Sequence, residues 1–281
     1  MHTPVLLQDT IDALNVQSGE RYIDATYGEG GHTRKILEKG GKVLALDWDE
    51  ENVQRQNVIL QRTCVGFVKN QSVKLVYGNY AHIKNIAQEY NFVPCKGIIF
   101  DLGLSMEQIR LSGRGFSYER GDEPLDMRIS LQLNVRAGDI INSYSRDQLY
   151  EIFARNAEEI NSGTIAEAID RTRSVKHIRT VNDLIEVIKK VTKNKQTVAR
   201  IFQALRVEVN HEFENIRNGL LGALDIIDSD GRIVIISFHP TEDRIIKNLI
   251  RELGLKGSKK PIVSKNGERF ERSAKLRIIT R

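Results

Sequence analysis

The stretch YIDATYGEGGHT, residues 22–33, constrains the fold of this 281-residue chain more than any other segment. A short aliphatic run, RYIDAT, leads into a turn that contains Gly28, Gly30 and Gly31, and the helical pattern TRKILEKG follows. A second aliphatic run, KVLALD, then ends at Asp47. A nucleotide-binding βαβ unit begins in this way, with a strand, a glycine turn, a helix and a second strand. The segment therefore predicts a parallel sheet with a ligand at the glycine turn.

The rest of the chain separates into strand-bearing and strand-free parts. VKLVYG (73–78) and KGIIFDLG (96–103) are expected strands, and HIKNIAQEY is the helix between them. From 112 to 196 no strand-like run occurs, whereas RDQLYEIFAR, TIAEAIDRTR and TVNDLIEVIKKV have helical patterns, with Thr180 as N-cap and Asp183 in the capping-box position. We therefore predict an α/β doubly wound core formed by residues 1–111 and 197–281, with an inserted all-helical domain at 112–196.

The last third of the chain should return to the sheet. Apolar residues recur at positions 198, 202, 205, 209, 213, 216 and 220, which predicts one long helix packed on the sheet. GRIVIISF is an expected strand, TEDRIIKNLIREL a helix, and SAKLRIIT a final strand that closes the edge.

Charge is distributed unevenly along the chain. The segment 244–281 has twelve Lys/Arg and three Asp/Glu, whereas the remaining residues have 30 and 34. A basic end of this kind favours a polyanionic partner, although a solvated basic tail would give the same count. No apolar run is long enough to span a membrane, and the first residues lack the basic start of a signal peptide. Cys64 and Cys95 have no metal-ligand spacing, which fits a reducing cytoplasm.

The glycine turn limits the kind of ligand. Asp47 follows Gly30 by 17 residues, where a carboxylate can accept hydrogen bonds from ribose hydroxyls. A dinucleotide site usually has the pattern G-x-G-x-x-G, but Thr33 stands at the third glycine position counted from Gly28. No pyrophosphate is then implied, and a nucleoside without phosphates, such as S-adenosylmethionine, suits the turn better.

Several further stretches are difficult to explain as scaffolding. They are HTPVLL near the start, DLGLSMEQ (101–108), RGFSY (114–118), PLDMR (124–128), FQALRVEVN (202–210), ISFHPTEDR (236–244) and RSAKLR (272–277). Together with the glycine turn they closely resemble the bacterial 16S rRNA cytosine-N4 methyltransferase family (MraW/RsmH type), in order from residue 2 to 277. This resemblance implies a class I methyltransferase core that uses S-adenosylmethionine and carries an inserted helical domain. It also implies that the substrate is a cytosine of 16S rRNA in the decoding centre of the small ribosomal subunit.

The resemblance also implies which residues hold the cofactor. Carried over by motif, they are Gly30, Gly31, His32, Asp47, Tyr80, Asp101 and Gln108. Other interpretations of these residues stay open, because an aromatic residue after a strand often packs in the core and an aspartate after a strand often caps a turn.

The chemistry of the proposed reaction selects two candidate catalytic residues. The N4 amine of cytosine is a poor nucleophile because its lone pair is conjugated with the ring, so a group that accepts its N–H would assist attack. Asp101, at the end of an expected strand, is the first candidate, and His239 after the GRIVIISF strand is the second. His239 could instead be a loop histidine whose ring is bonded to the backbone. No residues have metal-ligand spacing, and methyl transfer requires no metal.

Candidate substrate-binding residues lie in the motifs from RGFSY (114–118) onward. Gln203, Arg206 and Asn210 share one face of the expected long helix and are predicted to face the substrate, unless that face is simply solvated. The cations Arg114, Arg128, Lys275 and Arg277 are predicted to meet phosphate.

The sequence departs from the family pattern at several of these stretches. QTVAR (196–200) replaces HPATR, SMEQ (105–108) replaces SSPQ, FHPTEDR (238–244) replaces FHSLEDR, and NGERFE precedes RSAKLR. These changes leave a second hypothesis open, a non-catalytic small-subunit assembly factor that has kept the cofactor pocket. A nicotinamide oxidoreductase is disfavoured by the missing glycine, and a DNA cytosine-N4 methylase by DLGL where a D/N-P-P-Y motif is expected. The sequence does not distinguish a monomer from a homodimer.

Overall fold

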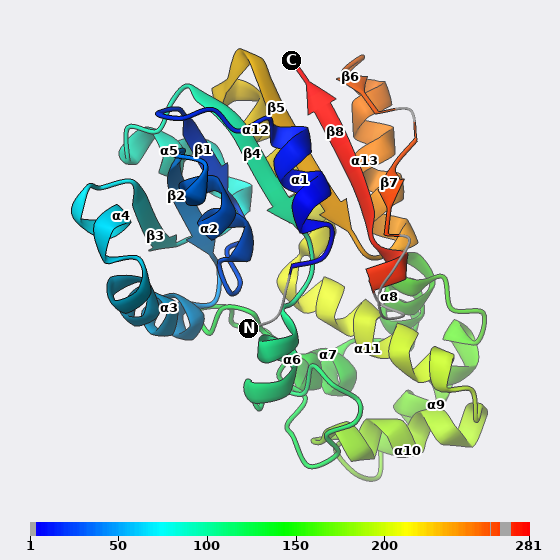
Figure 1. Ribbon diagram of the computed structural model, residues 1–281. Helices are drawn as coiled ribbons and strands as arrows, with labels where there is room; N and C mark the ends of the chain where they lie inside the picture. Colours follow the sequence, from blue (N-terminus) through cyan, green and yellow to red (C-terminus); the bar gives the residue numbers. More distant parts are fainter. Residues whose placement is uncertain (1–3, 259, 265–270) are drawn as a thin grey trace. The chain divides into compact units, whose positions relative to one another are not determined.

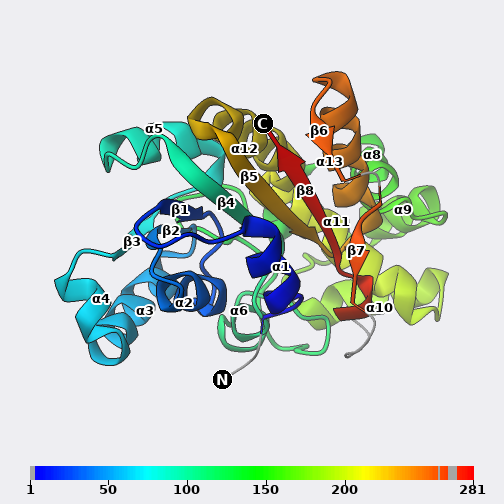
Figure 2. The same cartoon turned by 45° about the horizontal axis from the view of Figure 1, so that its top comes forward.

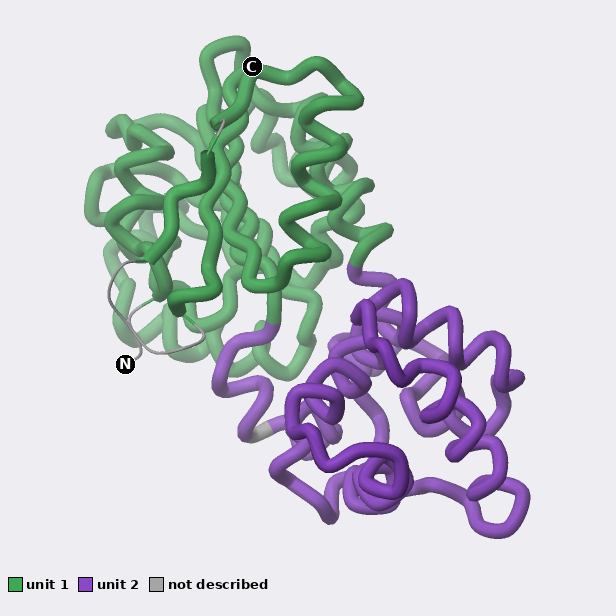
Figure 3. Tube along the Cα trace, turned by 90° about the vertical axis from the view of Figure 1, so that its right-hand side faces the viewer, with its two compact units in different colours: residues 1–103, 213–281 green, residues 104–212 purple. Residues whose placement is uncertain are grey.

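The computed structural model describes residues 4–258, 260–264 and 271–281. The chain divides into two compact units, which Figure 3 distinguishes by colour. Residues 1–103 and 213–281 form the sheet unit, and residues 104–212 form the helical unit. The helical unit therefore extends beyond the predicted insertion (112–196) at both ends, because the helices that border this segment pack with it.

The sheet unit contains an eight-stranded, mostly parallel sheet (Figure 1). Its strands are β1 (Arg21–Asp24), β2 (Lys42–Asp47), β3 (Val73–Tyr77), β4 (Cys95–Asp101), β5 (Ile227–Ser237), β6 (Lys256–Gly257), β7 (Ile262–Val263) and β8 (Lys275–Thr280). The order is β3-β2-β1-β4-β5-β8-β6, with β1 to β5 parallel and β8 antiparallel to β5. The doubly wound, class I methyltransferase-like sheet is thus confirmed. The prediction that SAKLRIIT closes the edge is wrong, because β6 and β7 both pair with β8.

Helices cover both faces of this sheet. They are α1 (Leu7–Leu14), α2 (Gly31–Glu38), α3 (Glu50–Thr63), α4 (Val65–Lys69), α5 (Ile83–Glu89), α12 (Glu212–Ile226) and α13 (Pro240–Glu252), with short 3-10 turns η1 (Tyr80–His82) and η2 (Glu271–Ser273). Figure 2 shows α1 and α2 on one face and α5 and α12 on the other. Successive strand residues point to opposite faces, so Tyr22 and Ile99 join one apolar cluster while Ile23 and Ile98 join the other.

The helical unit is built from α6 (Met106–Leu111), α7 (Ala137–Ser143), α8 (Arg146–Ala157), α9 (Ser162–Arg173), α10 (Val181–Val191) and α11 (Lys195–Asn210). The described residues 104–212 contain no strand, only an isolated bridge between Pro124 and Thr180. The three helices predicted between 146 and 191 are confirmed as α8, α9 and α10. The Oγ1 of Thr180 accepts from the Asp183 N–H, as predicted for the capping box.

The predicted long helix is two helices. α11 ends at Asn210, His211 takes a left-handed conformation with φ 50°, and α12 begins at Glu212. The apolar residues at 198, 202, 205 and 209 belong to the core of the helical unit, whereas those at 216 and 220 pack on the sheet. The apolar spacing continues across His211, so the spacing alone does not reveal that one helix ends there and another begins.

Within the described part of the chain, no helix combines the length and the apolar character that crossing a membrane requires.

Candidate active site

The glycine turn joins the end of β1 to the start of α2 and is fixed on both sides. The Ala25 N–H donates to the Ile99 carbonyl of β4 (2.9 Å), and the Tyr27 N–H donates to the Leu46 carbonyl of β2 (2.7 Å). Gly30 has φ 74°, and a Cβ there would lie 2.3 Å from the Tyr27 hydroxyl oxygen. Only glycine satisfies both the backbone angle and this close approach.

The next residue, Gly31, is needed for a different reason. A Cβ on Gly31 would lie 2.1 Å from Cγ of Pro4, so the proline ring rests against the first turn of α2. Val5 is buried in the apolar cluster on the same face of the sheet. These contacts give the HTPVLL stretch a structural role at the glycine turn; its first two residues, at 2 and 3, lie outside the described residues.

Thr33 explains why the third glycine is missing. Its hydroxyl donates to Oδ2 of Asp24, the last residue of β1, at 2.6 Å. The Thr26 N–H donates to Oδ1 of the same carboxyl group (3.3 Å). Asp24 is fully buried, and burial raises its pKa. Our residue-by-residue reasoning overlooked Asp24, although a carboxylate directly before a glycine turn was visible in YIDAT.

Asp47, the predicted ribose ligand, also holds the turn in place. Its Oδ2 accepts from the Gly28 N–H (3.0 Å) and from Nδ2 of Asn52 (2.6 Å), and its Oδ1 accepts from the Asp49 N–H (2.9 Å). A carboxylate has about four acceptor positions, so one is left for a ligand hydroxyl. Burial raises the pKa of Asp47 to about 6. Asn52 was not predicted; it also donates to the Gly28 carbonyl (2.9 Å).

Asp101 ends β4 beside the same turn and has unsatisfied polar atoms around it. Its N–H donates to the Thr26 hydroxyl at 2.6 Å, while its Oδ2 lies 3.7 Å from Nδ1 of His32. Among the residues that the structure describes, neither Oδ1 of Asp101 nor Nε2 of His32 has a hydrogen-bond partner. Burial, reinforced by the negative charge of Asp24, raises the pKa of Asp101 to about 8. Burial lowers the pKa of His32 to about 4, so both side chains are mainly neutral at pH 7.

Tyr80 follows β3, two residues after Gly78. The Gly78 N–H donates to the Asp47 carbonyl at 3.0 Å, which joins the ends of β2 and β3. The Tyr80 ring meets Phe100 edge-on, with centroids 5.7 Å apart, and a Cβ on Gly219 of α12 would lie 2.8 Å from it. Part of the ring therefore packs in the core, and the predicted cofactor contact of Tyr80 stays a prediction.

These residues define what we call the carboxyl edge, namely Asp24, Asp47 and Asp101 at the ends of β1, β2 and β4. Burial raises the pKa of all three carboxyl groups, which means that the site lacks compensating positive charge. The edge lies where the strand order reverses between β1 and β4, the usual ligand position in such sheets. A cationic nucleoside fits these donors and acceptors, because it would supply both hydroxyls and positive charge.

The other predicted residues of the sheet unit make structural contacts. The ring Nδ1 of His239 accepts from the Thr241 N–H (3.3 Å) and caps α13, as the loop-histidine alternative expected. Arg277 is 4% exposed and donates to Asp243 from Nε (2.6 Å) and Nη2 (3.2 Å). The predicted phosphate contact of Arg277 is therefore corrected, since its guanidinium group is buried against a carboxylate. Lys275 lies 3.3 Å from the same carboxylate, but its side chain is 35% exposed.

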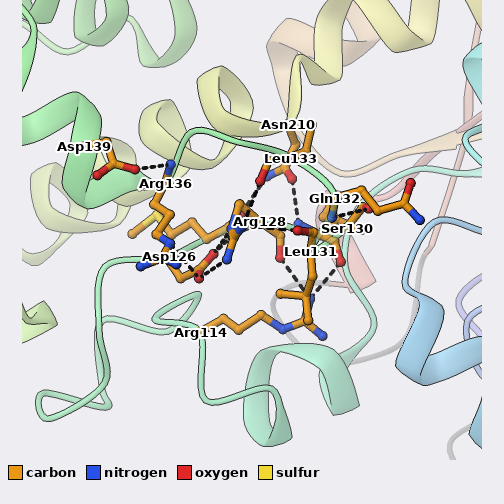
Figure 4. A network of polar contacts seen from close by, with 12 residues as sticks. Arg114, Asp126, Arg128, Ser130, Leu131, Gln132, Leu133, Arg136, Asp139 and Asn210 are labelled. Atoms are coloured by element: carbon orange, nitrogen blue, oxygen red, sulfur yellow. Dashed lines mark hydrogen bonds and ion pairs between the residues drawn. The ribbon is translucent and has the colours of Figure 1, made fainter.

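The remaining predicted residues belong to the helical unit. Two of them, Arg114 and Arg128, form with Asp126 what we call the arginine network (Figure 4). Arg128 donates to both oxygens of Asp126 and to the carbonyls of Leu131 and Leu133. Arg114 is 7% exposed and donates to the carbonyls of residues 128 and 129. These donors hold the PLDMR loop. The predicted phosphate contact of the buried Arg114 is corrected, whereas that of the partly exposed Arg128 stays a prediction.

The predicted residues of α6 and α11 include some that make internal contacts and some that stay candidates for ligand contact. Asn210 is fully buried and donates to the Met127 carbonyl (2.7 Å), and Arg206 forms a two-pronged ion pair with Glu212. The substrate-facing role of the fully buried Asn210 is therefore corrected, whereas that of the partly exposed Arg206 stays a prediction. Gln203 is half-buried and stays a predicted substrate contact. Gln108 closes the capping box of α6 with Ser105, and its cofactor contact stays a prediction.

Sheet order, glycine turn and carboxyl edge together define a class I methyltransferase that binds a nucleoside cofactor. The model of the MraW methylase family matches residues 1–281, so this chain belongs to that family. The methyl donor of this class is S-adenosylmethionine.

Curated relatives cover most of the chain. Ribosomal RNA small subunit methyltransferase H of Dictyoglomus thermophilum is 37% identical over 290 residues, which cover 99% of this chain and 96% of that protein. The protein of the same name from Thermomicrobium roseum is 38% identical over 257 residues (89% of this chain, 77% of that protein). That of Bacteroides fragilis is 34% identical over 262 residues (91% and 82%).

Proposed function

We propose that this chain methylates the exocyclic N4 of a cytosine in the decoding centre of small-subunit (16S) rRNA, with S-adenosylmethionine as donor. The relatives named as small-subunit rRNA methyltransferases support the RNA substrate. The observation that carries the chemistry is Asp101, which ends β4 with a buried oxygen that no described residue satisfies. Cytoplasmic location follows from this substrate.

Cofactor binding is assigned to the sheet unit. The donor supplies a methyl group already activated on a positively charged sulfur. The carboxyl edge favours that charge. Asp47 and Asp101 have raised pKa values, and a cation beside either carboxyl group would stabilise its ionised form. The backbone of Gly30 and Gly31 leaves room for the amino-acid end, and Asp47 has an acceptor position for ribose. His32 and Tyr80 complete the proposed set of the sheet unit, and the cofactor contact of Gln108, a residue of the helical unit, stays a prediction.

Asp101 is assigned the catalytic contact. As an acceptor for an N4–H, it would localise the nitrogen lone pair, and as a carboxylate it could take the proton. Its raised pKa keeps the carboxyl group protonated at neutral pH until positive charge approaches. The ionised form is therefore favoured when the donor is present. Reaching a base amine requires an unstacked cytosine, which single-stranded RNA provides at low cost.

The test is methyl transfer from radiolabelled S-adenosylmethionine to small subunits that lack the modification, followed by mass mapping of the rRNA. We expect label on a single cytosine N4. Label on a ring carbon or on ribosomal protein would contradict the proposal, and particle binding without any transfer would favour an assembly factor.

A further inference from the structure

The corner between α10 and α11 carries an exposed group of lysines that the site does not use. We call Lys189, Lys190, Lys193 and Lys195 the lysine corner; all four are exposed. Residues 187–207 contain six Lys or Arg and no Asp or Glu. Because six residues span at most about 20 Å, the four lysines share one region of the surface.

The other cations of the helical unit are mostly paired internally. Ion pairs with Asp or Glu involve Arg120, Arg128, Arg136, Arg146, Arg155, Arg171, Arg173, Lys176, Arg200 and Arg206. Within the described ranges, no ion pair or hydrogen bond involves a side chain of the lysine corner. Glu186 precedes Lys190 by one helical turn, yet no ion pair joins them, although this spacing usually permits one.

Local stability does not account for this arrangement. Lys189 and Lys190 lie in the last turn of α10, where a cation is favourable to the helix dipole. Lys195 is the first residue of α11, where a cation is unfavourable, and that first turn contains no acidic residue. Neighbouring lysines of the corner are one to three residues apart in the sequence, so their like charges repel each other over the Debye length of about 8 Å. An external anion would relieve this repulsion.

We propose that the lysine corner binds the phosphate backbone of the RNA substrate, which rests on the proposed rRNA function. Lysine ammonium groups act as compact point charges that contact phosphate without reading sequence. Such contacts would orient the helical unit on rRNA, while selection of the cytosine would be left to other residues.

The test compares two full-length variants in which four exposed lysines become glutamine. The first carries Lys189→Gln, Lys190→Gln, Lys193→Gln and Lys195→Gln. The matched control makes the same charge change on exposed lysines of the sheet unit, with Lys39→Gln, Lys42→Gln, Lys69→Gln and Lys247→Gln. Binding to unmodified 16S rRNA and to small subunits is measured between 50 and 300 mM salt, together with S-adenosylhomocysteine affinity.

We expect the first variant to reduce the slope of log K against log salt by about 3, at about 0.7 per lost phosphate contact, and affinity to fall at least about tenfold. Cofactor affinity should stay unchanged, and the control slope should fall by less than about 1. Equal slopes for the first variant and the wild type would overturn the proposal. Loss of binding to subunits but not to naked rRNA would also overturn it and indicate a ribosomal protein. A wild-type chain that binds no rRNA would instead refute the proposed function.

Discussion

The carboxyl edge of the sheet unit and the arginine network of the helical unit both bury charged groups, but they leave them in different states. In the arginine network, Arg128 satisfies both oxygens of Asp126, and although burial opposes it, this contact holds the pKa of Asp126 below its ordinary value. At the carboxyl edge, burial raises the pKa of Asp101, and one of its oxygens has no partner among the described residues.

This difference separates scaffold from site. An ion pair whose donors and acceptors are all used has few hydrogen-bonding groups left for a ligand. Removing one partner lowers the stability of the fold, because the other charge is left without compensation. A carboxyl oxygen without a donor destabilises the fold slightly, and a ligand that donates a hydrogen bond to it removes this destabilisation. This contrast supports the assignment of the arginine network to the scaffold and of the acids at the strand ends to the proposed site.

The largest effect should follow from Asp101→Asn. Methyl transfer in a single turnover should fall about 10²- to 10⁴-fold, because the proton acceptor is lost. The melting temperature should not fall, since Oδ1 has no described partner to lose. The exposed Asp12→Asn serves as control and should leave both unchanged. Transfer at a near-normal rate would remove Asp101 from catalysis.

Arg128→Met should give the opposite pattern. It removes the guanidinium donors of Asp126 and of two carbonyls, while the backbone N–H of residue 128 and Arg136 stay beside the Asp126 carboxylate, so the free energy of unfolding should fall by about 1–3 kcal/mol in a denaturant titration. Arg146→Met, which removes an exposed ion pair with Asp147, should cost less than about 0.5 kcal/mol. Equal stability of the two variants would mean that the arginine network is not scaffold.

Asp47→Ala tests the residue that serves both purposes. Loss of a charge-assisted contact should weaken S-adenosylhomocysteine binding about ten- to a hundredfold in calorimetry. Asn52→Ala removes one donor to Asp47 and should have a smaller effect. If Asp47→Ala binds normally, the carboxylate only supports the turn.

The stability of the protein without cofactor should depend on pH in a direction set by the carboxyl edge. Folding raises the pKa of Asp101 to about 8 and of Asp47 to about 6 from the ordinary 3.8. Between about pH 4 and 8 the folded Asp101 and Asp47 retain protons that these groups have lost in the unfolded chain, so each group lowers the stability as pH rises, by less than about 1.4 kcal/mol per unit. His32, whose pKa is lowered from 6.5 to about 4, acts in the opposite direction up to about pH 6.5, so the fall in stability is expected between about pH 6.5 and 8, where Asp101 still titrates. Asp101→Asn should show a flatter profile in thermal melts; an unchanged profile would contradict the raised pKa.

The smallest effect concerns Lys275 of β8, for which Arg277 on the same strand serves as the comparison. Lys275→Gln should reduce the salt slope of RNA binding by at most about 1 and leave the melting temperature nearly unchanged. Arg277→Gln should instead lower the melting temperature, because Asp243 loses its buried partner. The reverse result would place Arg277 on the RNA.

Much of this arrangement could be predicted from sequence. The strands are short aliphatic runs that end at Asp or Gly. Because neighbouring strands are parallel, their carboxyl ends lie at one edge of the sheet, so Asp47 and Asp101 could be placed there. The helices between 146 and 191 have clear apolar periods and capping residues.

The rest depended on long-range contacts that no local pattern contains. Periodicity could not reveal the left-handed His211, because the apolar spacing continues across it. A cation in a family motif looks the same whether its partner is phosphate or a distant aspartate, and the pairing of Arg277 with Asp243 exists only once β8 lies beside β5. The acceptor role of Asp24 for Thr33 was missed for the same reason, since the turn must form before the two meet.

That last hydrogen bond has an evolutionary consequence. A dinucleotide-type turn would need glycine at position 33, and this single change would remove the hydroxyl donor from the fully buried Asp24 carboxyl group, which would keep the Thr26 N–H. The intermediate would be less stable than either end point unless position 24 changed as well. A dinucleotide-type turn in this chain would therefore call for coupled changes at positions 24 and 33.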